Sequence, residues 1–336
     1  MKTTQSTIRF GFGVLAAVVG FLHGGSVAAK DIHVLFLGNS YTNRHDIPDL
    51  VEEILEEGDP DVDVHVDRVI YGGQNMFKHA TYYFSQSFIE QASISNAELE
   101  SRIMKMQSYL QSKQPPESEE WNAHWAALGG KANFADIHKH IRRAIVNHQA
   151  LLANNPRTRW DYVVLQSWRD VSADPNQAYA KYATKLAEVV NEQGAEVILY
   201  MTSPETQNQK PVASPVAPES ADRDLLVGTT LTRRIMPKAV VHVPLAIRRI
   251  QEDGTELCFR YVNDGHPNQT CAFLTTNLFY AALTGKSPEG LLFDTVTENK
   301  VKNGKDPDGG PLKVTFNGAT KSYLQRAAFE STQDFN

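Results

Sequence analysis

The clearest structural signal in this chain is the stretch VLFLGNSYT, from Val34 to Thr42. Its four apolar residues end at Gly38, and a short apolar run bounded by a turn residue predicts a buried strand. Ser40 follows that strand at the position where parallel α/β sheets place their ligands and chemistry. Ser40 is therefore a candidate nucleophile, with helix capping as the alternative role.

Further strand patterns alternate with helical patterns along the chain. This alternation predicts a mostly parallel sheet with helices on both faces. We expect one domain over residues 30–336, with a helical insertion at about 77–150 that covers the sheet edge or the site. The expected strands are 33–38, 62–70, 161–166, 197–201 and 239–244. The expected helices are 46–58, 134–152, 178–192, 225–236, 270–283 and 323–331, with another that ends near 250.

Composition and charge exclude some classes of protein. The chain has 336 residues, of which 41% are hydrophobic and 21% charged, so it is not a disordered protein. Its net charge is −6 and it has no basic stripe, which argues against a nucleic-acid partner. The pattern requires no cofactor.

The first 29 residues have the pattern of a secretory signal peptide. A weakly positive start precedes an apolar stretch at 10–22, and small residues allow cleavage near Ala28 or Ala29. The alternative is an uncleaved anchor, although the stretch is short for a spanning helix. No later segment is long and apolar enough to cross a membrane. We therefore expect an exported protein, periplasmic or extracellular, without an integral membrane segment after cleavage.

Three other segments carry candidate site residues. His266 stands in a loop with Gly and Pro on either side, and an imidazole is the usual base for a serine nucleophile. Gly72-Gly73 ends the second strand, where a glycine amide can approach an oxyanion. Gln166 ends the third strand and can donate through its amide. The alternatives are an ordinary loop histidine for His266, a plain turn for the glycine pair, and an amide that meets solvent for Gln166.

Two histidines and two cysteines have the residue types for a metal site or a disulfide. His138 and His140 follow Asp136, but a solvated helix face explains them better than a metal site, and we expect no metal. Cys258 and Cys271 are the chain's two cysteines, and in an exported protein they permit a disulfide. Two separate thiols are the alternative.

The candidate segments resemble the four blocks of the SGNH (GDSL-type) hydrolase superfamily, and are similar to a poorly characterised exported branch of it. The resemblance covers about residues 31–285. Its blocks correspond to GNSYT at 38–42, YGGQN at 71–75, WDYVVLQ at 160–166 and NDGHP at 263–267. It implies a three-layer α/β/α flavodoxin-like sandwich and metal-free ester hydrolysis through an acyl-enzyme.

The resemblance also assigns roles to residues. Ser40 is the expected nucleophile, His266 the base, and the oxyanion donors are Ser40, Gly73 and Gln166. We expect substrate contacts from four residues in or near these blocks, Asn39, Asn75, His79 and Trp168. A Cys258–Cys271 bond would restrain the loop that carries His266.

Two blocks depart from the family pattern. Gln166 stands where the family has Asn. The last block has Asn263 three residues before His266, where the family has Asp. Asp264 is favoured to orient the ring, with Asn263 or a Ser–His dyad as alternatives. The expected function is an exported carbohydrate esterase that removes acetyl or other short acyl groups. The alternatives are a lipid esterase or thioesterase, and a non-catalytic glycan-binding or envelope protein on a degenerate SGNH scaffold.

Overall fold

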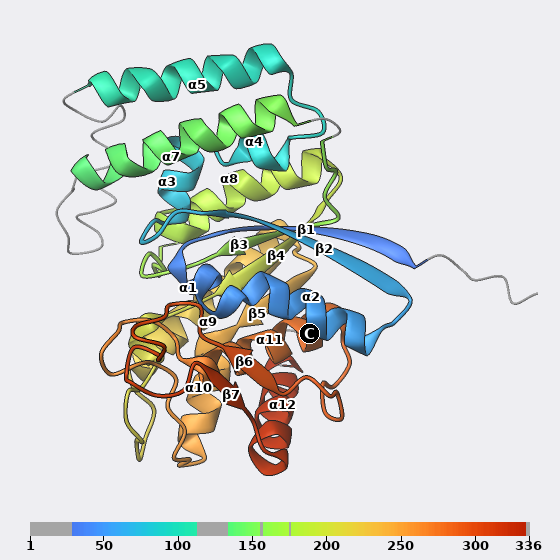
Figure 1. The fold of residues 1–336 in the computed structure, drawn as a ribbon, viewed down its shortest axis with the longest axis vertical. Helices are drawn as coiled ribbons and strands as arrows, with labels where there is room; N and C mark the ends of the chain where they lie inside the picture. The colour runs from blue at the N-terminus through green and yellow to red at the C-terminus, as the bar shows by residue number, and fades with distance from the viewer. Residues whose placement is uncertain (1–28, 113–133, 155–156, 175, 334–336) are drawn as a thin grey trace, which may run out of the picture.

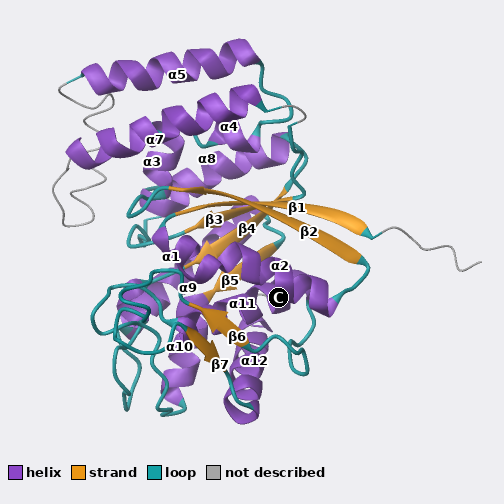
Figure 2. Cartoon of the chain, in the orientation of Figure 1, coloured by secondary structure: helices purple, strands orange, loops and turns teal. Residues whose placement is uncertain are grey.

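The computed structural model describes residues 29–112, 134–154, 157–174 and 176–333. Its centre is a five-stranded sheet of order β2-β1-β3-β4-β5, in which every pair is parallel (Figures 1 and 2). This order is the doubly wound order of flavodoxin. The strands are β1 (Lys30–Gly38), β2 (Val62–Ile70), β3 (Tyr162–Gln166), β4 (Glu196–Met201) and β5 (Ala239–His242).

Helices cover both faces of this sheet, so the fold is the expected three-layer α/β/α sandwich. One side carries α3 (Met76–Thr81), α4 (Gln86–Ile89), α5 (Asn96–Gln111), α7 (Phe134–Ala153), α8 (Ala178–Glu192) and α9 (Pro218–Ile235). The other side carries α2 (Ile47–Gly58), α10 (Val243–Glu252), α11 (Gln269–Thr284) and α12 (Gly318–Thr332). The short helices are α1 (Ser40–Asn43), η1 (Arg44–Asp46) and η2 (Pro204–Thr206).

The alternation of side chains along each strand creates two cores. In β1, Leu35 and Leu37 pack into the core beneath α7 and α8, whereas Val34 and Phe36 pack into the core beneath α2 and α11. Because both faces are covered, the central strands are continuous apolar runs. Strand β2 lies at the sheet edge and alternates between buried and more exposed positions. This explains why its sequence pattern differs from that of β1.

The segment between β2 and β3 extends one side of the sandwich. Helix α5 packs on α7, and Figure 1 shows both helices outside α8, away from the sheet. Residues 113–133, which include Trp121 and Trp125, lie outside the described residues. The signal peptide expected for residues 1–29 lies there too, except for Ala29. Within the described ranges, no helix combines the length and apolar character that a membrane span needs.

Several boundaries differ from the sequence prediction. Helix α9 begins at Pro218, seven residues before the start expected at residue 225. The fifth strand ends at His242, because Pro244 lies in the first turn of α10. The C-terminal region also forms a small antiparallel hairpin, β6 (Thr295–Thr297) and β7 (Lys313–Thr315), which was not expected. This hairpin is important because Glu298 and Lys300, which follow β6, contact Arg44 and Asp264.

Candidate active site

Ser40 lies at the point where the strand order reverses. Strand β1 pairs with β2 on one side and with β3 on the other, so its carboxyl end opens into the switch-point crevice of the sheet. Ser40 is the first residue of α1. The side chain of Asn39 caps this helix by accepting a hydrogen bond from the Tyr41 N–H at 2.9 Å. The cap fixes the turn that presents Ser40.

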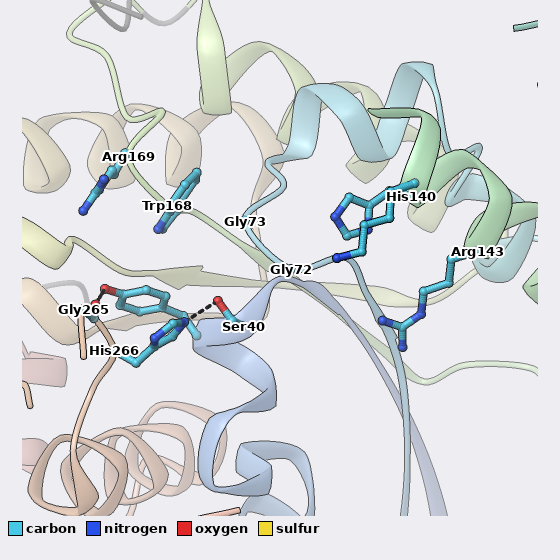
Figure 3. Close-up of a pocket in the computed structure, with 11 residues that line it drawn as sticks. Ser40, Gly72, Gly73, His140, Arg143, Trp168, Arg169, Gly265 and His266 are labelled. Atoms are coloured by element: carbon cyan, nitrogen blue, oxygen red, sulfur yellow. Dashed lines mark hydrogen bonds between the residues drawn. The ribbon is translucent and has the colours of Figure 1, made fainter. Parts of the chain in front are cut away.

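The structure brings Ser40, His266 and Asp264 into one hydrogen-bonded chain. Ser40 Oγ lies 2.8 Å from His266 Nε2, although the two residues are 226 positions apart (Figure 3). The other ring nitrogen, Nδ1, hydrogen-bonds to Asp264 Oδ1. A carboxylate on Nδ1 holds the proton there and leaves Nε2 free to accept the serine proton. This is the arrangement that activates a serine.

Asp264, and not Asn263, reaches the histidine ring. Asn263 is exposed, and its backbone N–H donates to Asp308 Oδ1 at 2.7 Å. The backbone N–H of Val262 donates to the other oxygen of the same carboxylate at 2.8 Å. Asp308 therefore anchors the loop just before Asp264. The Ser–His dyad with only a backbone carbonyl is not the geometry observed.

Two cations hold Asp264 in its charged form. Its second oxygen, Oδ2, accepts from Arg44 at 3.0 Å and from Lys300 at 2.7 Å. Burial raises the pKa of Asp264, but the hydrogen bonds from Lys300, His266 and Arg44 outweigh it and hold that pKa well below its usual range. Asp264 therefore stays ionised at every pH at which a histidine titrates.

Arg44 in turn is fixed by Glu298, the residue that follows β6. The Arg44 Nε–H donates to Glu298 Oε1 at 3.0 Å, and its Nη2 also contacts the same carboxylate. Burial raises the pKa of Glu298, but Arg44 and His45 lower it by more than burial raises it. The pKa of Glu298 is therefore below its usual value. The two carboxylates of Asp264 and Glu298 thus share one buried guanidinium, which suits the forked geometry of arginine.

Tyr41 ties the serine turn to the histidine loop. Its hydroxyl donates to the Gly265 carbonyl at 2.6 Å, and its ring lies 5.6 Å from the His266 ring between centroids. Burial raises the pKa of Tyr41, so the hydroxyl remains a donor. Helix α1 therefore supplies Ser40, the candidate nucleophile, and, one residue later, a contact that positions the His266 loop.

Two residues that line the cleft, Ser40 and Gly73, carry backbone amides that are candidate oxyanion donors. Gly73 has φ = +67°, a left-handed conformation that favours glycine, and it lines the same cleft. Among the described residues, neither the Gly73 N–H nor the Ser40 N–H donates a hydrogen bond. These donors are therefore available to an oxyanion.

Gln166 does not have the role expected from the sequence. Its side chain is 2% exposed, and its amide nitrogen donates to Asn39 Oδ1 at 3.1 Å and to the Ser167 carbonyl at 3.0 Å. Its carbonyl oxygen accepts from the Asn39 N–H at 2.8 Å and from the Thr42 hydroxyl at 2.6 Å. Gln166 therefore holds the turn that carries Ser40. Gly38 is required beside it, because an added Cβ would collide with Gln166 and Thr42.

The structure also buries three of the four residues expected to contact substrate. Asn39 is 2% exposed, and its side-chain oxygen accepts from the Tyr41 N–H and the Gln166 amide. Asn75 caps α3 by accepting from the Lys78 N–H at 3.3 Å. His79 is fully buried between the Gly38 carbonyl at 3.0 Å and Ser85 Oγ at 2.8 Å, and burial lowers its pKa to about 3. These residues shape the site from beneath, and Trp168 alone of the four lines the cleft.

The cleft above Ser40 has a volume of about 620 Å³. It extends beyond the triad to residues of α7 and of the loop after β3, as Figure 3 shows for His140, Arg143, Trp168 and Arg169. The segment between β2 and β3 therefore contributes one wall. The lining residues are Ser40, Tyr41, Gly72, Gly73, Lys139, His140, Arg143, Trp168, Arg169, Gly265 and His266.

The structure contradicts one further expectation and decides between the two alternatives for the cysteines. His140 does not lie on a solvated face: it is 5% exposed, and its ring lies 5.9 Å from that of Tyr71 between centroids. Cys258 and Cys271 are free thiols, so the disulfide is not formed. Cys271 is buried in the core beneath α11, whereas Cys258 is partly exposed in the preceding loop. The His266 loop is held instead by Tyr41 and Asp308.

Sequence reasoning missed Tyr41, Arg44, Glu298 and Lys300. Tyr41 and Arg44 lie within four residues of Ser40, so their proximity to the candidate nucleophile is a usable signal. Glu298 and Lys300 lie about 260 residues later, in a polar segment without a strong strand pattern. Only the folding of the β6–β7 hairpin brings Lys300 to Asp264 and Glu298 to Arg44.

Comparisons with known proteins give distant similarities. No protein-family model matches the chain, and no curated protein does. One similar solved structure is a DUF4886 family protein from Bacteroides uniformis, with 12% identity and a TM-score of 0.45 over 91% of this chain and 97% of that chain. Another is a candidate SGNH hydrolase from Slackia heliotrinireducens, with 17% identity and a TM-score of 0.38 over 76% of this chain and 100% of that one. The assignment of the active site therefore rests on the geometry of this chain. That geometry defines a flavodoxin-like sandwich with a serine–histidine–aspartate arrangement at its switch point.

Proposed function

We propose that this protein is an exported serine esterase of the SGNH type that removes acetyl or other short acyl groups from a carbohydrate. The observation that carries the proposal is the chain Ser40–His266–Asp264, with 2.8 Å between Ser40 Oγ and His266 Nε2. The open cleft with Trp168 on its wall supports a carbohydrate substrate, because an aromatic ring can stack on a sugar. The apolar N-terminal stretch at 10–22 supports export.

The geometry supports the following steps. Ser40 Oγ attacks the ester carbonyl carbon while His266 Nε2 takes the hydroxyl proton. The N–H groups of Ser40 and Gly73 stabilise the oxyanion of the tetrahedral intermediate. The intermediate collapses to an acyl-enzyme, and His266 gives its proton to the departing sugar oxygen. Water, deprotonated by the same ring, then releases the acid and restores Ser40.

The experiment compares the purified protein with Ser40→Ala and His266→Ala. We expect the wild type to react with a fluorophosphonate and to hydrolyse p-nitrophenyl acetate, and both variants to lose at least about a thousandfold in kcat. Ser287→Ala and His65→Ala are matched controls, because both residues are at the surface away from the cleft. Equal activity of Ser40→Ala and the wild type would leave a non-catalytic glycan-binding role as the better explanation.

A further inference from the structure

The cleft around Ser40 is lined by cations. Lys139 and Arg143 come from α7, and Arg169 from the loop after β3. None of the described lining residues is acidic. The whole chain, however, has a net charge of −6. The basic character is therefore a local property of this cleft.

Among the residues that the structure describes, two of these cations have no acidic partner. Arg169 pairs with Glu205 at 3.3 Å and also lies over the Trp168 ring, 5.4 Å from its centroid. Lys139 and Arg143 are exposed, and within the described part of the chain no carboxylate lies within ion-pair distance of either. Their charges are therefore available to a ligand that enters the cleft.

Lys139 and Arg143 lie on one face of α7, and both line the cleft. Residues four positions apart lie on the same face of a helix, about 6 Å apart along its axis. Arg142, the sequence neighbour of Arg143, does not line the cleft. Figure 3 shows Arg143 and His140 on one side of Ser40, and Trp168 and Arg169 on the other. A ligand that spans the cleft thus passes Ser40 between a cationic helix face and an aromatic wall.

We infer that the ester cleaved at Ser40 belongs to an anionic carbohydrate, whose carboxylate groups are bound by Lys139 and Arg143. This inference rests on the proposed esterase function. Both side chains are exposed on the helix, so they meet the part of the substrate that remains at the mouth of the cleft. That part is the carbohydrate, because the acyl group must lie at Ser40 beside the Gly73 amide. An acidic glycan presents repeated charges and can satisfy both cations at once.

The test uses two polymers that differ in charge alone. Polygalacturonate and the same polymer after reduction of its carboxyl groups are acetylated to the same degree. We expect wild-type kcat/KM to favour the anionic polymer by about tenfold, which corresponds to two ion pairs of ordinary surface strength. This preference should weaken as salt is raised, because exposed charges are screened.

The variants locate the effect. In Lys139→Ala/Arg143→Ala the ratio of kcat/KM values for the two polymers should fall to about one. Arg142→Ala is the matched control and should keep the wild-type ratio. A wild-type ratio near one, or a ratio that the double variant does not change, would overturn the inference while Ser40-dependent hydrolysis of p-nitrophenyl acetate keeps the esterase proposal. A preference confined to mono-p-nitrophenyl succinate over the acetate would place the charge on the acyl group and also overturn it.

Binding separates this inference from catalysis. In the Ser40→Ala background, unacetylated polygalacturonate should bind more tightly than the carboxyl-reduced polymer by calorimetric titration, and the added Lys139→Ala/Arg143→Ala changes should abolish the difference. This outcome supports anionic carbohydrate binding even if Ser40 proves dispensable for hydrolysis. Equal binding of both polymers would contradict it.

Discussion

Replacing Asp264 with asparagine tests the role of the orienting carboxylate. Asparagine keeps the size of the side chain but removes the charge that stabilises the imidazolium when His266 holds the Ser40 proton. Asp264 Oδ2 also faces Arg44 at 3.0 Å and Lys300 at 2.7 Å. Together with Glu298, these residues form a cluster of two cations and two anions. After the change, the three remaining charged groups leave one net positive charge beside the ring.

The expected loss is large for this reason. Asp-to-Asn replacement in a serine–histidine–aspartate triad lowers kcat by about 10⁴-fold, which corresponds to about 5.5 kcal/mol. The residual positive charge opposes formation of the imidazolium, so we expect kcat to fall by at least this factor. KM should change by less than about threefold, because the carboxylate does not line the cleft.

The assay is steady-state hydrolysis of p-nitrophenyl acetate between pH 6 and 9, with fluorophosphonate labelling in parallel. Asn263→Ala is the matched control and should stay within about threefold of the wild type, because the backbone N–H of Asn263, and not its side chain, contacts Asp308. Retention of more than about a tenth of wild-type kcat by Asp264→Asn, or a greater loss in Asn263→Ala, would refute the reasoning.

Two further predictions follow from buried polar groups. Gln166→Ala leaves the Asn39 N–H and the Thr42 hydroxyl without their partner, so urea unfolding should show a loss of about 2–5 kcal/mol and kcat should fall as well; a variant that loses neither would show that Gln166 does not hold the Ser40 turn. Burial raises the pKa of Asp224 to about 8, so the folded state holds a proton that the unfolded state releases near pH 4. The stabilisation is present at low pH and is lost as pH rises through about 8. Between about pH 4 and pH 8, the free energy of unfolding of the wild type should therefore fall by up to about 1.4 kcal/mol per pH unit because of Asp224, and Asp224→Asn should lack this fall. Parallel curves of unfolding free energy against pH for the two proteins would contradict this prediction.

The local sequence was sufficient for much of the framework. Apolar runs ending in Gly38 and Gln166 predicted β1 and β3, because a strand buried on both faces needs a continuous apolar pattern. Polar residues at the ends of those runs marked the carboxyl edge of the sheet. Local patterns did not find the β6–β7 hairpin, whose strands are three residues long and mostly polar.

The contacts that define the site were beyond local patterns. Whether Gln166 faces the cleft or the Ser40 turn depends on Asn39, which lies 127 positions earlier. An amide side chain can satisfy either environment. The Gln166 amide is buried and makes four hydrogen bonds with Asn39, Thr42 and Ser167, and this fixes it at the Ser40 turn.

The sequence by itself determined the order of strands and helices along the chain, the position of Ser40 directly after β1, and the position of His266 in a loop before α11. These follow from hydrophobic periodicity and turn residues, which act over a few neighbouring positions. Only the tertiary structure decided that Asp264 contacts the His266 ring, that Arg44 and Lys300 contact the Asp264 carboxylate, and that Glu298 holds Arg44. It also decided that α7 lines the cleft with cations. The physical reason is that hydrogen bonds and ion pairs depend on distances between side chains far apart in the chain, such as the 226 positions between Ser40 and His266.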